Sequence, residues 1–313
     1  MPAPRSGPQL SSVTPAAIRK TTRPEAAGLF DPAREHDACG VGFIVNLRNT
    51  PSHAIIEKGL SILENLEHRG AVGADPLMGD GAGIMVQIPD RFFRKEADRL
   101  GWRLPAPGHY AVAFIFMPQD EALRRKMERV VEKVIEDEGQ TVIGWRDVPH
   151  DNSPLSKAPD IVATEPCHRQ VVIGRGDGID TEDDFERKLY IIRKVCSSKI
   201  YSAYSGEPTD FYIVSMSCRT LVYKGMFLSW QLRAYYKDLA DPDFESALAL
   251  VHQRFSTNTF PSWRLAHPYR FVCHNGEINT VRGNVNWMAA RQASVSSPLF
   301  GADITKLWPI SYP

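Results

Sequence analysis

The feature that most constrains the fold is an abrupt change of composition at Cys39. Residues 1–38 carry six prolines, several Ser and Thr residues and few large apolar ones. Such a segment cannot bury enough apolar surface to offset its ordering entropy. From residue 39 the run Cys-Gly-Val-Gly-Phe-Ile-Val-Asn (39–46) is typical of a buried strand. We therefore expect the core to begin at Cys39, and residues 1–38 to be either a disordered tail or a leader that is removed.

Apolar periodicity predicts alternating groups of strands and helices in the rest of the chain. The order contains hairpin-like strand pairs, which favours an α+β fold of stacked antiparallel sheets with helical layers over a doubly wound sheet. Helices are predicted over residues 54–68, 119–138, 181–199 and 279–293. Strands are predicted over residues 39–46, 84–88, 111–117, 171–173, 211–218, 220–223 and 271–273, with a further strand that ends near residue 252.

Composition excludes several classes of function. Lys plus Arg (37) balance Asp plus Glu (37) to a formal net charge of zero, which disfavours general binding to a nucleic-acid backbone. No run approaches the 18 apolar residues of a membrane span, and the N-terminus lacks the apolar segment of a secretory signal. The five cysteines, an odd number spread along the chain, are not a disulfide framework. We therefore expect a reducing compartment and a cytoplasmic protein.

Neither a nucleotide nor a metal site is indicated. The stretch Gly79-Asp-Gly-Ala-Gly83 has neither G-x-G-x-x-G spacing nor a following Lys-Ser/Thr pair, so its glycines are interpreted as turn and close-packing positions. No C-x-x-C or H-E-x-x-H occurs, and no metal is expected. Cys167, Cys196 and Cys218 are interpreted as small buried apolar residues.

Cys39 is the strongest candidate for a nucleophile. If residues 1–38 are removed, Cys39 becomes N-terminal, and its α-amine would have a pKa near ~8, close to the operating pH. That amine could act as the base for its own thiol, so that one residue supplies both functions. The simpler alternative is a buried cysteine that opens a strand.

Two polar stretches at strand ends could complete a site. In His274-Asn275-Gly276, the Asn275 amide and a backbone N–H could form an oxyanion hole, although Asn-Gly is also a common turn. In the run from His252 to Thr257, Arg254 could hold a substrate carboxylate bidentately and Thr257 could add a hydroxyl. An isolated Arg more often forms a surface salt bridge.

Four stretches together resemble class-II glutamine amidotransferase domains, which are N-terminal nucleophile hydrolases. They are Cys39-Gly-Val-Gly-Phe, His68-Arg-Gly-Ala-Val-Gly-Ala-Asp75, His252-Gln-Arg-Phe-Ser-Thr-Asn258 and His274-Asn-Gly-Glu-Ile-Asn279. The longer run from Phe260 to Tyr269, followed by Asn275 to Asn284, resembles the large (alpha) subunit family of bacterial, NADPH-dependent glutamate synthases. The resemblance covers the chain from about residue 30 to its end, so we expect residues 39–313 to form the amidotransferase domain, truncated at its C-terminus.

The resemblance implies a four-layer αββα sandwich that hydrolyses L-glutamine to glutamate and ammonia. It implies that Cys39 is the nucleophile, that Asn275 and Gly276 stabilise the oxyanion, and that Arg254 and Thr257 hold the substrate α-carboxylate. Arg69-Gly70 matches a pair that we interpret as structural support. Asn258 lies where relatives of other amidotransferase types often have His, so it is given no role.

The same resemblance implies partners and cofactors outside this chain. The parent enzyme would carry FMN, an iron–sulfur cluster, and FAD and NADPH through a small (beta) subunit, and would transfer the ammonia to 2-oxoglutarate. No cofactor is expected within residues 1–313. The family also places an acidic residue for the substrate α-amine beyond Pro313, so we expect poor glutamine affinity from the fragment.

Two alternatives remain open at this stage. A papain-like hydrolase would use Cys39, His252 or His274, and Asn275, but it prefers a cysteine at a helix start. The chain could also be a non-catalytic module of the parent enzyme with an incomplete site.

Overall fold

The computed structural model describes residues 28, 31, 40–70, 76–155, 159–204, 210–254, 260–272 and 280–311. The chain divides into two compact units, Met1–Ala38 and Cys39–Pro313. The helices and strands of the described residues all belong to the second unit. No helix among these residues is long and apolar enough to cross a membrane.

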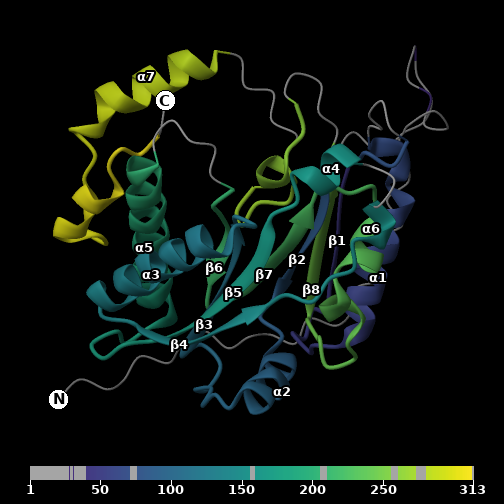
Figure 1. Ribbon diagram of the computed structural model, residues 1–313, viewed down its shortest axis with the longest axis horizontal. Helices are drawn as coiled ribbons and strands as arrows, with labels where there is room; N and C mark the ends of the chain where they lie inside the picture. The colour runs from purple at the N-terminus through teal and green to yellow at the C-terminus, as the bar shows by residue number, and fades with distance from the viewer. Residues whose placement is uncertain are drawn as a thin grey trace, which may run out of the picture. The chain divides into compact units, whose positions relative to one another are not determined.

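The first antiparallel sheet joins strands that lie far apart in the sequence. Its strands are ordered β1-β8-β2-β7, and β1 and β8 lie side by side (Figure 1). Val41 pairs with His252 at one end of the β1–β8 ladder, and Val45 pairs with Leu248 at the other. The bounds are β1 (Val41–Val45), β8 (Leu248–Gln253), β2 (Ala82–Gln87) and β7 (Thr220–Gly225).

The second sheet is also antiparallel, in the order β4-β5-β3-β6. Its strands are β4 (Thr141–Asp147), β5 (Cys167–Gly174), β3 (Tyr110–Met117) and β6 (Tyr212–Ser217). Every residue of β3 is buried. The observed architecture is therefore α+β with two antiparallel sheets, as the strand and helix pattern predicted.

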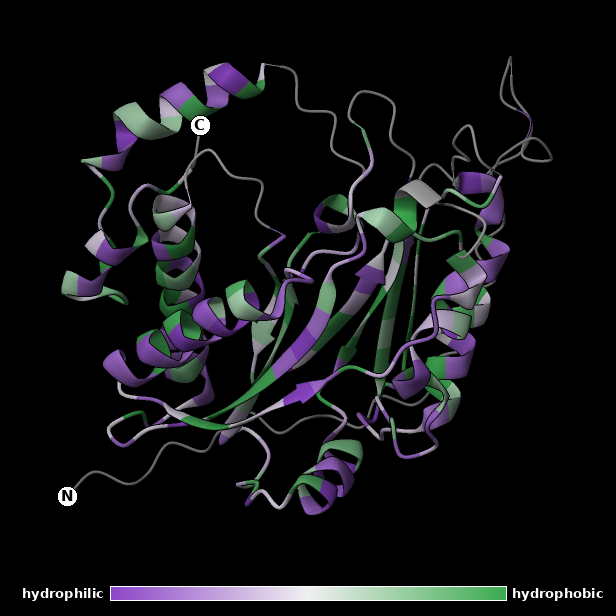
Figure 2. Ribbon diagram, in the orientation of Figure 1, coloured by the Kyte–Doolittle hydropathy of each residue, from purple (hydrophilic) through white to green (hydrophobic). Residues whose placement is uncertain are grey.

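The two faces of β3 belong to different apolar clusters. Val112, Phe114 and Phe116 belong to a cluster that also contains residues of β2, β7, β8 and α1. The alternate residues Ala113 and Ile115 belong to a second cluster with residues of helices α3 and α5. Because side chains alternate along a strand, a strand with apolar residues on both faces must be covered on both. The strands are correspondingly rich in apolar residues (Figure 2).

Three helices cover the sheets. Helix α1 (His53–Asn65) packs on β1 and β8, and a Cβ atom on Gly59 would lie only 2.7 Å from the Cβ of Ala249. Helices α3 (Glu121–Asp137) and α5 (Glu182–Ala203) pack against each other and against β4 and β6 of the second sheet. Their polar and apolar residues alternate along the ribbon (Figure 2), as in helices that bury one face.

The remaining helices are shorter than α1, α3 and α5. The remaining α-helices are α2 (Asp90–Leu100), α4 (Pro159–Ala163), α6 (Gln231–Tyr235) and α7 (Val281–Gln292). The 3₁₀ helices are η2 (Glu67–Arg69), η3 (Ser153–Leu155), η4 (Lys237–Ala240), η5 (Trp263–Leu265) and η6 (Gly301–Leu307).

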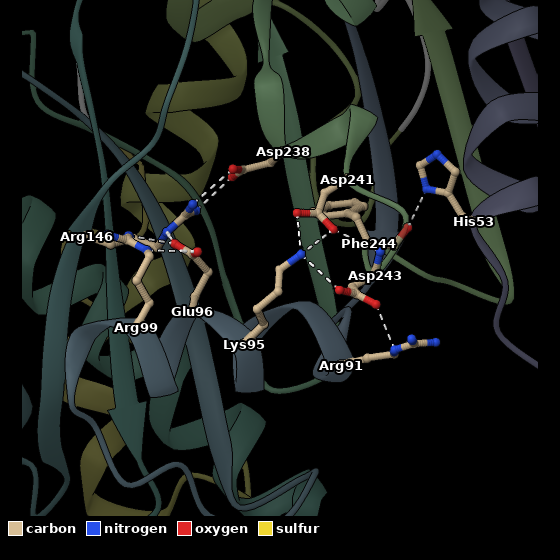
Figure 3. A network of polar contacts seen from close by, with 10 residues as sticks. All are labelled: His53, Arg91, Lys95, Glu96, Arg99, Arg146, Asp238, Asp241, Asp243 and Phe244. Atoms are coloured by element: carbon tan, nitrogen blue, oxygen red, sulfur yellow. Dashed lines mark hydrogen bonds and ion pairs between the residues drawn. The ribbon is translucent and has the colours of Figure 1, made fainter.

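A buried ion-pair network ties α2 and η4 to the second sheet (Figure 3). The guanidinium of Arg146, on β4, donates two hydrogen bonds to Asp238, at 2.7 and 2.9 Å. It donates a third to Glu96 of α2, at 3.0 Å. The side chains of Arg146 and Asp238 are each only 2% exposed. The buried charges of Arg146 and Asp238 are paired with each other. The network can therefore hold β4, α2 and η4 in one arrangement.

Several predicted boundaries differ from those observed. The strand predicted over residues 171–173 is the end of the longer β5, and β4 and α2 were not predicted. The strand predicted over residues 271–273 is wrong for the two residues that the structure describes. Phe271 and Val272 are exposed and belong to no strand. Instead the N–H of Tyr269 donates to the carbonyl of Val272, which folds this apolar run into a turn.

Candidate active site

The start of β1 and the end of β8 meet at the first residue after Cys39. The carbonyl of Gly40 accepts a hydrogen bond of 2.7 Å from the N–H of Gln253, the last residue of β8. This bond continues the β1–β8 pairing beyond Val41 and His252. Gly40 is thereby held beside Gln253. The next residue in the sequence, Arg254, follows β8 directly.

Glycine is required at two positions of this junction. A Cβ atom on Gly40 would lie 2.1 Å from the carbonyl oxygen of Gln253. One on Gly70 would lie 2.4 Å from Nε2 of the same glutamine. Arg69 also lies here, since its Cβ is 3.3 Å from the atom that would be added to Gly40. Arg69-Gly70 therefore packs against the junction, which fits the supporting role inferred from the sequence.

Arg254 is a buried residue, unlike a typical surface arginine. It is 5% exposed. Its backbone N–H donates to the carbonyl of Gly81 at 2.8 Å, and its Nη1 donates to the carbonyl of Asp80 at 3.3 Å. Backbone and side chain are both held by the same turn, so the direction of the guanidinium is fixed. Asp80 was not singled out from the sequence. It contacts Arg254 through its backbone carbonyl, which every residue type has, so the residue type does not indicate the contact.

The glycine-rich turn before β2 is built for close packing, as predicted. Gly81 has φ +129°, and a Cβ atom there would lie 2.8 Å from the Cβ of Ala266. A Cβ atom on Gly83 would lie 2.5 Å from the carbonyl oxygen of His267. The segment around residues 266–267 therefore lies directly on this turn, which the sequence did not indicate.

Lys224 fixes that covering segment from inside the protein. It is fully buried on β7, and its Nζ donates to the carbonyls of Arg264 and Ala266 at 2.9 and 2.7 Å. The amine lies 4.3 Å from the ring centroid of Tyr269. Burial holds the pKa of Lys224 well below its usual value, and the nearby charges of Arg193 and Arg254 lower it further. A lysine directly after the predicted strand 220–223 was the available signal, and sequence reasoning missed it.

His252 packs beneath the same segment. It is fully buried on β8, and its ring centroid lies 4.6 Å from that of His267. The His267 ring in turn lies 4.5 Å from that of Tyr269. The papain-like alternative would require this buried imidazole, or His274, to act as a base.

The other predicted site residues lie outside the described residues. These are Cys39, Thr257, Asn275 and Gly276, together with Asn258 and His274 of the alternatives. Their roles stay predictions. Among the other cysteines, Cys196 and Cys218 are buried, as expected, and burial raises the pKa of each thiol to about 12. Cys167 is only half-buried, so the prediction of a buried residue is wrong at that position.

Comparison with known proteins identifies the family of this chain. Residues 39–313 match the class-II glutamine amidotransferases. The chain is 47% identical over 289 residues to the large chain of NADPH glutamate synthase from Bacillus subtilis (strain 168), covering 92% of this chain and 18% of the relative. The corresponding chain of Azospirillum brasilense is 44% identical over 286 residues, 91% of this chain and 18% of the relative.

A relative with a different electron donor is nearly as similar. The chloroplastic ferredoxin-dependent glutamate synthase 2 of Arabidopsis thaliana is 41% identical over 291 residues, which cover 93% of this chain and 18% of the relative. The chain thus spans about a fifth of the length of the relatives it matches. Because the family match extends over the whole second unit, the chain belongs to the class-II glutamine amidotransferases.

Proposed function

We propose that this chain hydrolyses L-glutamine to glutamate and ammonia through a glutamyl thioester on Cys39. The observation that carries the proposal is the hydrogen bond between Gly40 and Gln253, which pairs the residue after Cys39 with the residue before Arg254. The family match also begins at residue 39, where the second compact unit begins. These observations support a site at the junction of β1 and β8, with Cys39 as the proposed nucleophile and Arg254 as the proposed carboxylate-binding residue.

The proposed chemistry needs few groups. Once residues 1–38 are removed, the α-amine of Cys39 takes the thiol proton, and the thiolate attacks the amide carbon of glutamine. Asn275 and the Gly276 N–H stabilise the oxyanion. The amine returns the proton to the leaving ammonia as the C–N bond breaks. Water then hydrolyses the thioester, releasing glutamate and restoring the thiol.

Substrate binding is assigned to Arg254 and Thr257. A guanidinium can hold a carboxylate through two parallel hydrogen bonds, and Arg254 is already oriented by the carbonyl of Asp80. Glutamine would then lie with its α-carboxylate at Arg254 and its side-chain amide toward Cys39.

We further propose that the two sheets and their helices form the four-layer αββα sandwich of N-terminal nucleophile hydrolases. The two apolar clusters on opposite faces of β3 support this layering, because one reaches the first sheet and the other reaches α3 and α5.

We assign the wider activity to a longer enzyme of the glutamate synthase type. There the ammonia would be transferred to 2-oxoglutarate, with FMN, an iron–sulfur cluster, FAD and NADPH outside this chain and a small subunit as partner. Of the relatives compared, the NADPH forms are the more similar, which favours that donor. We expect the enzyme to work in the cytoplasm.

The test combines labelling with mass spectrometry. The full chain is incubated with an electrophilic glutamine analogue, and the N-terminal residue and the labelled position are identified. We expect a chain that begins at Cys39 and carries one label there. Cys39→Ala should abolish both labelling and glutaminase activity, whereas the matched control Cys167→Ala should keep both.

Other outcomes separate the alternatives. A chain that retains residues 1–38 and is still labelled at Cys39 would favour a histidine base over the α-amine. A folded chain that starts at Cys39 and yet forms no adduct would favour the non-catalytic module. Full activity in Cys39→Ala would refute the proposed nucleophile.

A further inference from the structure

A second cluster of chemically competent side chains lies outside the β1–β8 junction. His150 follows β4, Glu165 precedes β5, and His168 lies on β5. One potential ligand atom from each residue lies within 4.8 Å of the other two. Glu165 and His168 are 6% and 1% exposed, whereas His150 reaches the surface. Two imidazoles and a carboxylate are the donor set that Zn²⁺ uses in many proteins.

The buried carboxylate of Glu165 accepts hydrogen bonds from the Tyr235 hydroxyl and the Asn152 amide, and among the described residues no Lys or Arg is paired with it. A buried charge is normally paired with an opposite charge or bound to a metal. Within the described part of the chain, its single ion-pair contact is with His150, whose Nε2 lies 3.7 Å from Oε1. That contact is long and counts as an ion pair only when the imidazole is protonated. A divalent ion between the two groups would satisfy the carboxylate and use the neutral imidazole.

Neighbouring groups orient the ligands as outer partners do in metal sites. Nδ1 of His150 lies 3.0 Å from the carbonyl of Val148 and must donate to it, so Nε2 keeps its lone pair on the side of Glu165. The amide of Asn152 donates to Oε2 of Glu165 at 3.3 Å. Such hydrogen bonds to the far side of a ligand set its tautomer and direction.

The backbone that carries the ligands is already fixed. The N–H of Val148 donates to the carbonyl of His168 at 3.0 Å, and the N–H of Asp151 donates to the carbonyl of Tyr235 at 2.9 Å. The rings of His150 and His168 lie 4.9 Å apart at 86°. A site whose ligands already converge loses little conformational entropy when an ion binds.

We infer that His150, Glu165 and His168 bind one divalent transition-metal ion, with Zn²⁺ the best match to the donor set. The hydroxyl of Tyr235 donates to Glu165 and lies 2.6 Å from Nε2 of His168. The ion replaces the Tyr235–His168 bond with a bond to Nε2. Glu165 and His168 form a Glu-x-x-His pair, a spacing that a search for H-E-x-x-H does not find.

The experiment measures Zn²⁺ bound per chain by equilibrium dialysis of the full chain, and the affinity by calorimetry. His150→Ala removes the exposed ligand, and Glu165→Gln keeps the shape of the buried one. The matched control is His109→Ala, an exposed histidine that contacts Arg175 and lies outside the cluster. Changes in outer-shell partners weaken metal binding by about 10–100-fold, so loss of a direct ligand should cost about 100-fold or more.

We expect one ion in the native chain and in His109→Ala, and its loss in both cluster variants. Because His150→Ala changes a residue at the surface, it decides the result even if Glu165→Gln fails to fold. Co²⁺ serves as a second probe, since nitrogen and oxygen ligands give no thiolate charge-transfer band. A native chain that binds no ion, or cluster variants that bind as the native chain does, would overturn the inference. So would a Co²⁺ spectrum of thiolate type that His150→Ala leaves unchanged.

Discussion

The buried amine of Lys224 donates to the carbonyl of Ala266 at 2.7 Å. This bond is linked to Arg254 through contacts at Gly81. Ala266 lies against Gly81, where a Cβ atom would be 2.8 Å from the alanine Cβ. The carbonyl of Gly81 accepts the backbone N–H of Arg254. Lys224 is therefore a positioning residue for the proposed substrate-binding guanidinium, acting through the segment that covers the turn.

Lys224→Met should impair glutamine binding more than the chemical step. Methionine fills the space but cannot donate to the two carbonyls, so the covering segment and Arg254 should shift together. Misplacement by ~1 Å can cost up to about 100-fold in rate, and here the loss should appear mainly as a higher KM. Steady-state glutaminase kinetics measure the split, with Lys126→Met at an exposed site on α3 as the control. A variant with unchanged KM and lowered kcat would contradict the positioning role.

Gly40→Ala should disrupt the junction itself. Its Cβ would lie 2.1 Å from the backbone oxygen of Gln253, which cannot move without separating β1 from β8. We expect a lower melting temperature and loss of glutaminase activity. Gly283→Ala is the control, because its Cβ would meet only the Thr280 side chain and alanine favours a helix by about 0.5–1 kcal/mol over glycine. Equal stability of the two variants would show that the junction tolerates a side chain.

Much of this arrangement could be predicted from the sequence, and the reasons differ by element. β3 and β6 were predicted almost to the residue, because long apolar runs with turn residues at both ends have few alternative structures. β4 was missed because most of its side chains are only half-buried, so the sequence from Thr141 to Asp147 lacks a clear alternation. Phe271 and Val272 do not form the predicted strand, because an apolar stretch forms a strand only where a partner strand can pair with it.

The sequence predicted the motifs of the candidate site, but it did not predict the tertiary contacts that hold those motifs in place. Arg254 was found because it lies in a run that resembles a family pattern. Lys224 donates to a backbone carbonyl far away in the sequence, and Asp80 accepts from Arg254 through its own backbone carbonyl. A local sequence pattern does not indicate contacts of this kind. The His150–Glu165–His168 cluster was missed for a similar reason, since its ligands come together only when β4 and β5 pair.

Removal of Arg146 should strongly destabilise the protein. Arg146→Met would leave the carboxylates of Asp238 and Glu96 facing each other without their shared cation (Figure 3). Loss of one partner from a buried ion pair typically costs about 3–5 kcal/mol in the free energy of unfolding. Urea denaturation measures this change. Arg125→Met removes an exposed pair with Glu121 and should cost no more than about 0.5 kcal/mol. Similar losses in the two variants would mean that the network contributes little.

The same network should make stability depend on pH in the acidic range. Although burial alone would raise it, hydrogen bonds and charges from Arg99 and Arg146 hold the pKa of Glu96 below its usual value of 4.5. The unfolded chain therefore binds a proton at a higher pH than the folded chain does. The stabilising contribution of Glu96 is fully present above pH 4.5 and is lost as the pH falls toward the lower, folded-state pKa.

Glu96→Gln tests this sign directly. The variant cannot lose a charge, so its stability should fall less steeply below pH 4.5 than that of the native chain. Urea midpoints measured from neutral pH downward for both proteins give the difference, in which the other titrating groups largely cancel. The gap between the two curves should be widest at neutral pH and should narrow as Glu96 is protonated. A gap that stays constant with pH would show that the carboxylate contributes through shape and hydrogen bonding and not through its charge.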